Sequence, residues 1–147
     1  WLVYQLTCWP LLARWDAVAA MGKRIEITEF DCSTWDDRLQ AEYVEDLALA
    51  AFSHPAMDSF LFWGFWEGAH WKAADGGHLI RRDWSPRPAM TAFDTLVKST
   101  LRTNAVGRGV WSGRAFKGRY EIVVERRGVR TVRTATVDGA VRLTIRV

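Results

Sequence analysis

The heptapeptide Ile-Glu-Ile-Thr-Glu-Phe-Asp at residues 25–31 decides the fold of the chain. Its apolar residues Ile25, Ile27 and Phe30 predict a short strand, and β-branched residues are typical of a buried parallel strand. The strand would deliver the carboxylate of Glu29 to its C-terminal edge. Because barrel enzymes keep their reactive groups at that edge, Glu29 is a candidate for chemistry.

Helices and a second strand surround this segment. Apolar residues at helical spacing predict a helix over Leu11–Met21, which Gly22 would end. An amphipathic pattern predicts another helix over Asp37–Phe52, and the apolar run Ser59–Trp63 predicts a second buried strand. A strand, a helix and a strand with short connections form the βαβ unit of a parallel sheet. A last helix is predicted to begin near Pro88, so the predicted class is α/β.

Several motifs occur in order between residues 11 and 100 and resemble those of glycoside hydrolase family 10, the endo-1,4-β-xylanases. The resemblance implies that the chain is the C-terminal portion of a (β/α)8 TIM barrel. A complete barrel needs roughly 250 residues, so the 147 residues predict a fragment that begins upstream of the seventh strand. The motifs are the strand ending at Glu29, the segment Gln40–Tyr43, the strand end Phe62–Gly64, Trp71, and Pro86–Ala89.

The resemblance also implies roles for residues at the strand ends. In this family the glutamate at the position of Glu29 is the nucleophile, and tryptophans at the positions of Trp63 and Trp71 wall the sugar site beside it. His70 is a further candidate for a substrate contact, although a lone loop histidine is more often a hydrogen-bonded structural residue. The implied substrate is β-1,4-xylan, the implied location is extracellular, and the chemistry needs no cofactor. The loop around Glu67 differs from the common family form, which leaves the polysaccharide preference open.

The second catalytic group of the family has no match in this chain. Retaining glycosidases need two carboxyl groups, and the family takes its acid/base glutamate from the fourth strand. Glu67 is expected on the correct face of the barrel, but no motif supports that role for it. The isolated chain is therefore predicted not to hydrolyse xylan. Two alternatives remain, a non-catalytic carbohydrate-binding protein and a barrel glycosidase that acts on another β-glycan.

The balance of charge changes near residue 102. Residues 1–101 carry 9 basic and 14 acidic residues, whereas residues 102–147 carry 11 and 3. This asymmetry predicts two domains, the barrel portion over residues 1–101 and a basic β-module over residues 102–147.

The basic module has the pattern of an antiparallel sheet. Apolar residues alternate with polar ones over residues 120–125 and again over residues 141–147, with turn signals at Gly128 and at Asp138-Gly139. Its arginines could bind nucleic acid, form a solvated strand face, or contact glucuronic acid branches on xylan. Nucleic acid is not the favoured partner, because alternating arginines on strands are more often a solvated face, but the sequence does not separate the three interpretations.

Composition predicts neither a metal site nor a membrane span. Cys8 and Cys32 give no disulfide framework and no metal-ligand spacing, and His54 and His78 lack a pattern of neighbouring ligands. No stretch reaches the roughly 18 apolar residues of a transmembrane helix. The oligomeric state is not indicated by the sequence.

Overall fold

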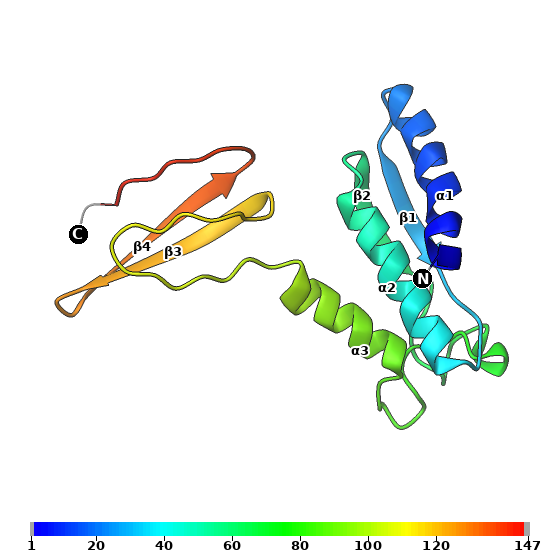
Figure 1. Cartoon of the computed structure of the whole chain (residues 1–147). Coiled ribbons are helices and arrows are strands. Elements are labelled where there is room, and N and C mark those ends of the chain that lie inside the picture. The colour runs from blue at the N-terminus through cyan, green and yellow to red at the C-terminus, as the bar shows by residue number, and fades with distance from the viewer. Residues whose placement is uncertain (1, 146–147) are drawn as a thin grey trace. The chain divides into compact units, whose positions relative to one another are not determined.

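The computed structural model describes residues 2–145, and the side chains from Pro10 onward. The chain divides after Ser99 into two compact units, which are described separately. The first unit is an α/β structure with three α-helices and a two-stranded sheet (Figure 1). Its elements are α1 (Leu2–Ala20), β1 (Ile25–Phe30), α2 (Asp37–Ser53), β2 (Met57–Phe62), a 3-10 turn (Ala73–Asp75), α3 (Pro88–Thr95) and a π-helical turn (Leu96–Thr100).

The sequence located these elements but not all of their ends. The strand β1 and the helix α2 lie where the periodicity predicted them. The first helix is longer than predicted, because it begins at Leu2 and continues through Pro10 instead of beginning at Leu11. The strand β2 begins at Met57 and ends at Phe62, so Trp63 follows the strand instead of ending it.

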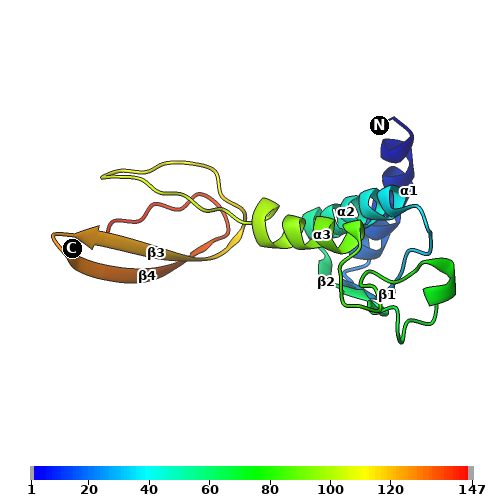
Figure 2. The ribbon, with the colours of Figure 1, turned by 90° about the horizontal axis from the view of Figure 1, so that it is seen from below.

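The sheet pairs β1 and β2 in parallel, as the βαβ interpretation requires. Its register shifts between Ile27 and Phe30, and this irregularity breaks the alternation of side chains along β1. Ile25, Ile27 and Phe30 are partly buried, whereas Thr28 and Glu29 are both exposed. The helices α1, α2 and α3 lie on one side of the sheet (Figure 2).

Two hydrophobic clusters hold the first unit together, and α2 contributes to both. In the first cluster Trp15 of α1 packs against Leu47 and Ala51 of α2, with Ile25, Ile27 and Met57 of the strands beside them. In the second cluster Val44 of α2 meets Leu79 of the loop after β2 and Ala89 of α3. Because α2 is shared, it fixes the sheet, the loop and α3 relative to one another.

The start of α2 is capped by Asp36, the residue before it. The carboxylate of Asp36 accepts hydrogen bonds from the backbone N–H groups of Arg38 and Leu39 at 3.0 and 2.9 Å, which is the geometry of a helix N-cap. The cap starts the helix six residues after β1 ends, so the connection at the C-terminal edge of the sheet is short.

The second unit is a β-hairpin flanked by irregular segments. Its strands β3 (Gly118–Arg126) and β4 (Val129–Val137) pair antiparallel without a register shift. The hairpin turns at Arg127 and Gly128, whose φ angles of 50° and 80° are the positive values that a tight two-residue turn requires. No residue from Thr100 to Ile145 is fully buried.

One strand of the basic module was assigned to the wrong residues. The sequence predicted a strand over residues 141–147, but the described part of that segment, residues 141–145, forms none. The partner of β3 is instead β4, a strand that the sequence pattern did not predict. The pairing follows directly from the turn at Arg127-Gly128, because a two-residue turn places the next residues opposite β3.

Candidate functional site

The C-terminal ends of β1 and β2 form one edge of the sheet. The backbone N–H of Trp63 donates a hydrogen bond to the carbonyl oxygen of Phe30 at 3.0 Å, and Phe30 pairs with Phe62 in the strand register. Glu29 is the chain neighbour of Phe30. The structure therefore brings Glu29 and Trp63 to adjacent strand ends, and both side chains are exposed.

Trp71 joins this edge through a hydrogen bond to the residue that follows β1. Its indole Nε1–H donates to Oδ2 of Asp31 at 2.9 Å, although the two residues are 40 positions apart in the sequence. The Lys72 ammonium lies 4.7 Å from the Trp71 ring centroid, within the range of a cation–π contact. The side chain of Trp71 remains 64% exposed, so its indole is held in place while much of its surface stays open.

Glu29 has no partner of its own among the described residues. No hydrogen bond or ion pair reaches its carboxylate in the part of the chain from residue 2 to 145. The register shift of β1 accounts for this exposure, because it places Glu29 away from the helices while returning Phe30 to them. A carboxylate without an internal partner is available to a ligand.

His70 lies behind this edge and is buried. Its Nδ1 accepts a hydrogen bond from the backbone N–H of Lys72 at 3.0 Å, and its Nε2 is buried without a protein partner. Gly64 and Gly77 bound the ring closely, since a Cβ at either position would lie 2.8 or 2.9 Å from a ring carbon. Burial lowers the pKa of His70, against the opposing influence of the Asp31 carboxylate. The structure thus gives His70 a packing environment and leaves it only 7% exposed.

A buried arginine anchors the loop that carries Trp71. Arg87 is 2% exposed, and its guanidinium donates to Oδ1 of Asp37 at 2.7 Å and to the carbonyl oxygens of His78 and Thr34 at 3.0 Å each. It also donates to the carbonyl oxygen of Gly76. One side chain thereby joins the loop after β2 to the loop after β1.

Gln40 makes the same connection from α2. Its amide Nε2 donates to the carbonyl oxygens of Cys32 at 2.8 Å and Gly76 at 2.9 Å, and the residue is fully buried. The two motifs that carried part of the resemblance, around Gln40 and Arg87, are therefore structural supports for the loops at the strand ends. Sequence reasoning did not assign either residue to the site, and their placement before and within helices gave no signal of these contacts.

The sequence profile of Glycosyl hydrolase family 10 matches residues 11–96. The chain belongs to this family. The match covers the elements from α1 to α3 and includes Glu29, Trp63, His70 and Trp71. The family resemblance inferred from the motifs is confirmed.

Relatives of this family 10 chain include proteins with different names. It is 34% identical over 112 residues to anti-sigma-I factor RsgI6 of Acetivibrio thermocellus, which covers 74% of the chain. It is 28% identical over 128 residues to endo-1,4-beta-xylanase 1 of Arabidopsis thaliana, which covers 84% of the chain. The chain spans only 15% and 13% of the lengths of these two relatives.

A solved family 10 structure shows the fold. Xylanase 10B from Thermotoga petrophila RKU-1, in complex with xylobiose, superposes with a TM-score of 0.53 at 23% sequence identity. The match covers 60% of this chain and 31% of that xylanase. The predicted fold class is confirmed, since the first unit is part of a TIM barrel and a small antiparallel sheet follows it.

The remaining polar residues of the loop after β2 support that loop. Glu67 Oε2 accepts a hydrogen bond from the backbone N–H of Arg82 at 2.8 Å and lies 3.9 Å from Nε2 of His78. Burial lowers the pKa of His78, and the nearby Arg87 guanidinium lowers it further. Trp66 and Trp84 stack on each other with ring centroids 5.0 Å apart. These contacts occupy Glu67 with its own loop.

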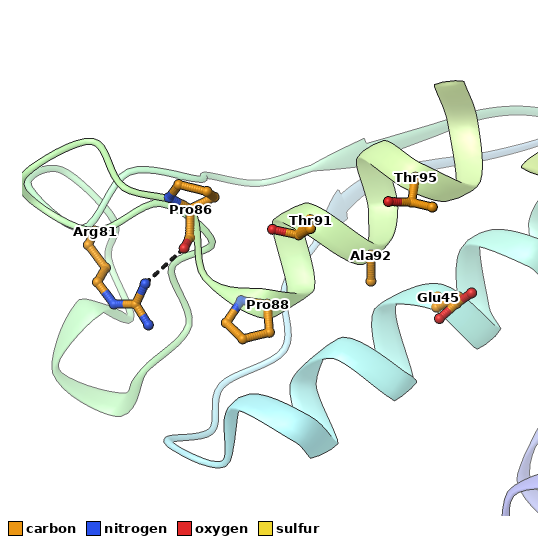
Figure 3. Close-up of a pocket in the computed structure, with 7 residues that line it drawn as sticks. All are labelled: Glu45, Arg81, Pro86, Pro88, Thr91, Ala92 and Thr95. Carbon is orange, nitrogen blue, oxygen red and sulfur yellow. Dashed lines mark hydrogen bonds between the residues drawn. The ribbon is translucent and has the colours of Figure 1, made fainter. Parts of the chain in front are cut away.

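An open groove of about 610 Å³ lies between α2 and α3, but it does not contain the predicted site (Figure 3). None of the four candidate site residues lines it. Arg81 projects into this region and donates to the carbonyl oxygen of Pro86 at 2.8 Å. The lining consists of Glu45, Arg81, Pro86, Pro88, Thr91, Ala92 and Thr95.

The described residues offer no ready metal centre or membrane span. No group of three or more His, Cys, Asp or Glu side chains could hold a metal ion within the searched part of the chain. In the same residues no helix combines the length and apolarity needed to cross a bilayer. Cys32 is a free thiol, and the side chain of Cys8 lies outside the described residues.

Proposed function

We propose that Glu29 is the nucleophile of a retaining hydrolysis of β-1,4-xylan, with Trp63 and Trp71 as the surfaces that hold the sugar. The observation that carries this proposal is that the three residues lie at one edge of the sheet. Trp63 is bonded to the neighbour of Glu29, and Trp71 is bonded to the residue two positions beyond it. The name of the Arabidopsis thaliana relative, endo-1,4-beta-xylanase 1, and the xylobiose in the Thermotoga structure support the substrate.

The mechanism gives the Glu29 carboxylate the first step. It would attack the anomeric carbon as the glycosidic bond breaks, and a second carboxyl group about 5–5.5 Å away would protonate the leaving oxygen. Water, activated by that second group, would then release the sugar from Glu29. The flat indoles of Trp63 and Trp71 present apolar surface with a polar N–H, which suits the C–H faces of a pyranose ring.

The second carboxyl group is not available from the neighbours of Glu29. Asp31 accepts the Trp71 indole N–H, and Glu67 accepts the backbone N–H of Arg82. We therefore propose that residues beyond this chain supply the acid/base group and that the 147-residue chain alone does not hydrolyse xylan. We also propose that the whole protein acts outside the cell, because xylan is a polymer too large to enter it, and that residues 1–101 and 102–147 are its separate domains in this region.

A chimaera tests the nucleophile. Residues 11–96 would replace the equivalent segment of the Thermotoga petrophila xylanase, which supplies the rest of a barrel. The chimaera should release reducing sugar from xylan, and Glu29→Gln should lower kcat by about four orders of magnitude or more, as loss of an enzymic nucleophile does. In Glu29→Gly, azide should restore turnover and yield a glycosyl azide of inverted configuration. Substantial activity of Glu29→Gln would rule out this role.

The matched control is Glu26→Gln, a second exposed carboxylate on the same strand, which should leave kcat unchanged. Trp63→Ala and Trp71→Ala should raise KM more than they lower kcat if the indoles bind substrate and transition state alike. Circular dichroism and a thermal melt would establish that each chimaera is folded before its kinetics are compared.

A second candidate is a family 10 domain that binds glycan without turnover. The specific observation behind it is the 34% identity with RsgI6, whose name describes an anti-sigma factor and not an enzyme. The same chimaera distinguishes the two. If it is folded and binds xylo-oligosaccharide in a Trp63-dependent manner but shows no Glu29-dependent hydrolysis, the binding function is favoured.

A further inference from the structure

The exposed loop before β3 contains a tryptophan whose ring packs against two glycines of the same loop. Trp111 is 52% exposed, and the glycines on either side of it lie against its indole. A Cβ at Gly107 would lie 3.2 Å from Cδ1 of Trp111, and a Cβ at Gly113 would lie 2.5 Å from Cζ2. A side chain at Gly113 would displace the indole, so the backbone of the loop lies against part of the ring and leaves the remainder open.

Two arginines flank this indole at equal distance along the chain. Arg108 and Arg114 stand three residues before and after Trp111, and both are exposed. Neither makes a hydrogen bond or ion pair with any residue that the structure describes. An open aromatic surface thus lies in a loop that also carries two free guanidinium groups.

The remaining charges of the second unit do not neutralise this loop. Two of its acidic residues are already engaged, since Asp138 lies 3.1 Å from Lys117 and Glu125 lies 3.9 Å from Arg130. The segment 102–147 has 11 basic residues and 3 acidic ones. The unit therefore presents an excess of positive charge that an anionic ligand would complement.

We infer that Trp111, Arg108 and Arg114 form a binding site for a carboxylate-bearing sugar. The open part of the indole stacks on the pyranose ring, and the planar guanidinium groups hold the carboxylate through charge-assisted hydrogen bonds. The ligand class rests on the proposed xylan function of the first unit, and the corresponding ligand is a glucuronic acid branch on xylan. Single-stranded nucleic acid is the competing ligand, because it also combines stacking surfaces with negative charge.

The test measures binding of the whole 147-residue chain by affinity electrophoresis and calorimetry. The probes are glucuronoxylan, the same polymer after chemical reduction of its carboxyl groups, and an oligothymidylate. The chain should bind glucuronoxylan about tenfold more tightly than the reduced polymer, since the two differ only in charge on the branch. Trp111→Ala, and separately the double variant Arg108→Gln/Arg114→Gln, should each weaken binding to glucuronoxylan about tenfold.

The matched control is Arg142→Gln, which removes a charge from another arginine of the same unit that has no partner among the described residues. It should change affinity by less than twofold. Amide signals of β3 and β4 in an NMR spectrum would show that the variants keep the hairpin, and Trp111→Phe should retain most of the binding that Trp111→Ala loses.

Three results would overturn the inference. Equal affinity for the native and the reduced polymer would show that the carboxylate is not recognised. Equal losses of affinity in Arg142→Gln and in the double variant would show that only the net charge of the unit matters. Tighter binding of the oligothymidylate than of glucuronoxylan would identify nucleic acid as the ligand of the loop. Failure of the xylan function gives a different result. The chimaera would then show neither Glu29-dependent hydrolysis nor Trp63-dependent binding, while the Trp111-dependent preference of the 147-residue chain for glucuronoxylan over the reduced polymer persisted.

Discussion

The two units of this chain are stabilised by different means. In residues 2–99 two clusters of buried apolar side chains share the helix α2, and every buried hydrophobic residue of the described chain lies between Trp15 and Leu96. From Thr100 to Ile145 a hairpin with good pairing buries no residue fully. A two-stranded hairpin without a core is marginal in water. We therefore expect the second unit to be the less stable of the two, although its strands are regularly paired.

The largest effect that would test this comparison is expected from Arg87→Ala. The change removes a buried cation that bonds four groups and leaves Asp37 and three carbonyl oxygens without it, so we expect a loss of about 3–5 kcal/mol from the free energy of unfolding of the first unit. Urea titration followed by tryptophan fluorescence would measure it. The exposed Arg82→Ala is the control and should cost less than about 0.5 kcal/mol. Equal effects of the two changes would show that the network contributes little.

A pair of valine truncations compares the two units directly. Val44 of α2 is fully buried, and Val44→Ala should cost about 2 kcal/mol through lost burial and a residual cavity. Val132 of β4 is exposed, and Val132→Ala should change stability by no more than about 0.5 kcal/mol. The midpoints and slopes of urea unfolding give both values. A loss of 2 kcal/mol at Val132 would mean that the hairpin is buried against something.

The helix cap offers a smaller, local test. Asp36→Ala removes the acceptor for the backbone N–H groups of Arg38 and Leu39 and should cost about 1 kcal/mol. Asp36→Asn keeps an acceptor and should cost a few tenths of that amount. Hydrogen exchange of α2 amides would locate the change, and exchange in β3 should stay as it was. Equal losses in the two variants would indicate that Asp36 acts through charge instead of capping.

The mildest perturbation is a change of pH, which should affect only the first unit. The chain has three histidines, all before residue 79, and burial lowers the pKa of His70 and His78 below the ordinary 6.5. Below pH 6.5 the unfolded chain therefore binds more protons than the folded chain. The contribution of His70 and His78 to the free energy of unfolding is complete above pH 6.5 and declines as the pH falls toward their pKa values in the folded chain. Glu67 opposes this shift at His78 and Asp31 opposes it at His70.

Urea midpoints at pH 7.5 and pH 5 would measure this decline. His78→Gln should reduce the difference between the two midpoints, and hydrogen exchange in β3 and β4, corrected for intrinsic rates, should not respond to pH. A constant midpoint in the parent chain, or the same pH response in the hairpin, would contradict the expectation.

Sequence periodicity predicted most of the first unit, because its elements bury one face each. The pattern of apolar residues over 37–52 gave α2 to within one residue at its C-terminal end. The same logic failed over 129–137, where arginines and threonines occur on both faces of β4 and no fully buried residue marks either face. The helix through Pro10 was missed because proline ordinarily ends such an element.

The site was predictable at the strand ends but not behind them. Glu29 could be located at a strand end from the apolar pattern, whereas Trp63 and Trp71 were assigned from the resemblance to the family, and hydrogen bonds place both tryptophans beside the end of β1. The roles of the three residues stay a prediction. The burial of His70 between two glycines depends on contacts across the loop that no local pattern encodes. The hydrogen bonds from Arg87 and Gln40 to the carbonyl oxygen of Gly76 likewise join residues far apart in the sequence, so no local pattern predicts them.

The hydrogen bond between Trp71 and Asp31 has a consequence for how this region can diverge. It ties the indole to the side chain of Asp31, the residue that immediately follows β1, so the position of Trp71 relative to Glu29 is set at the end of that strand. Substitutions at the exposed residues of the loop, such as Phe65 and Ala69, can accumulate without altering this hydrogen bond. The connection is thus free to diversify what lies at the rim while the geometry at the base is inherited unchanged.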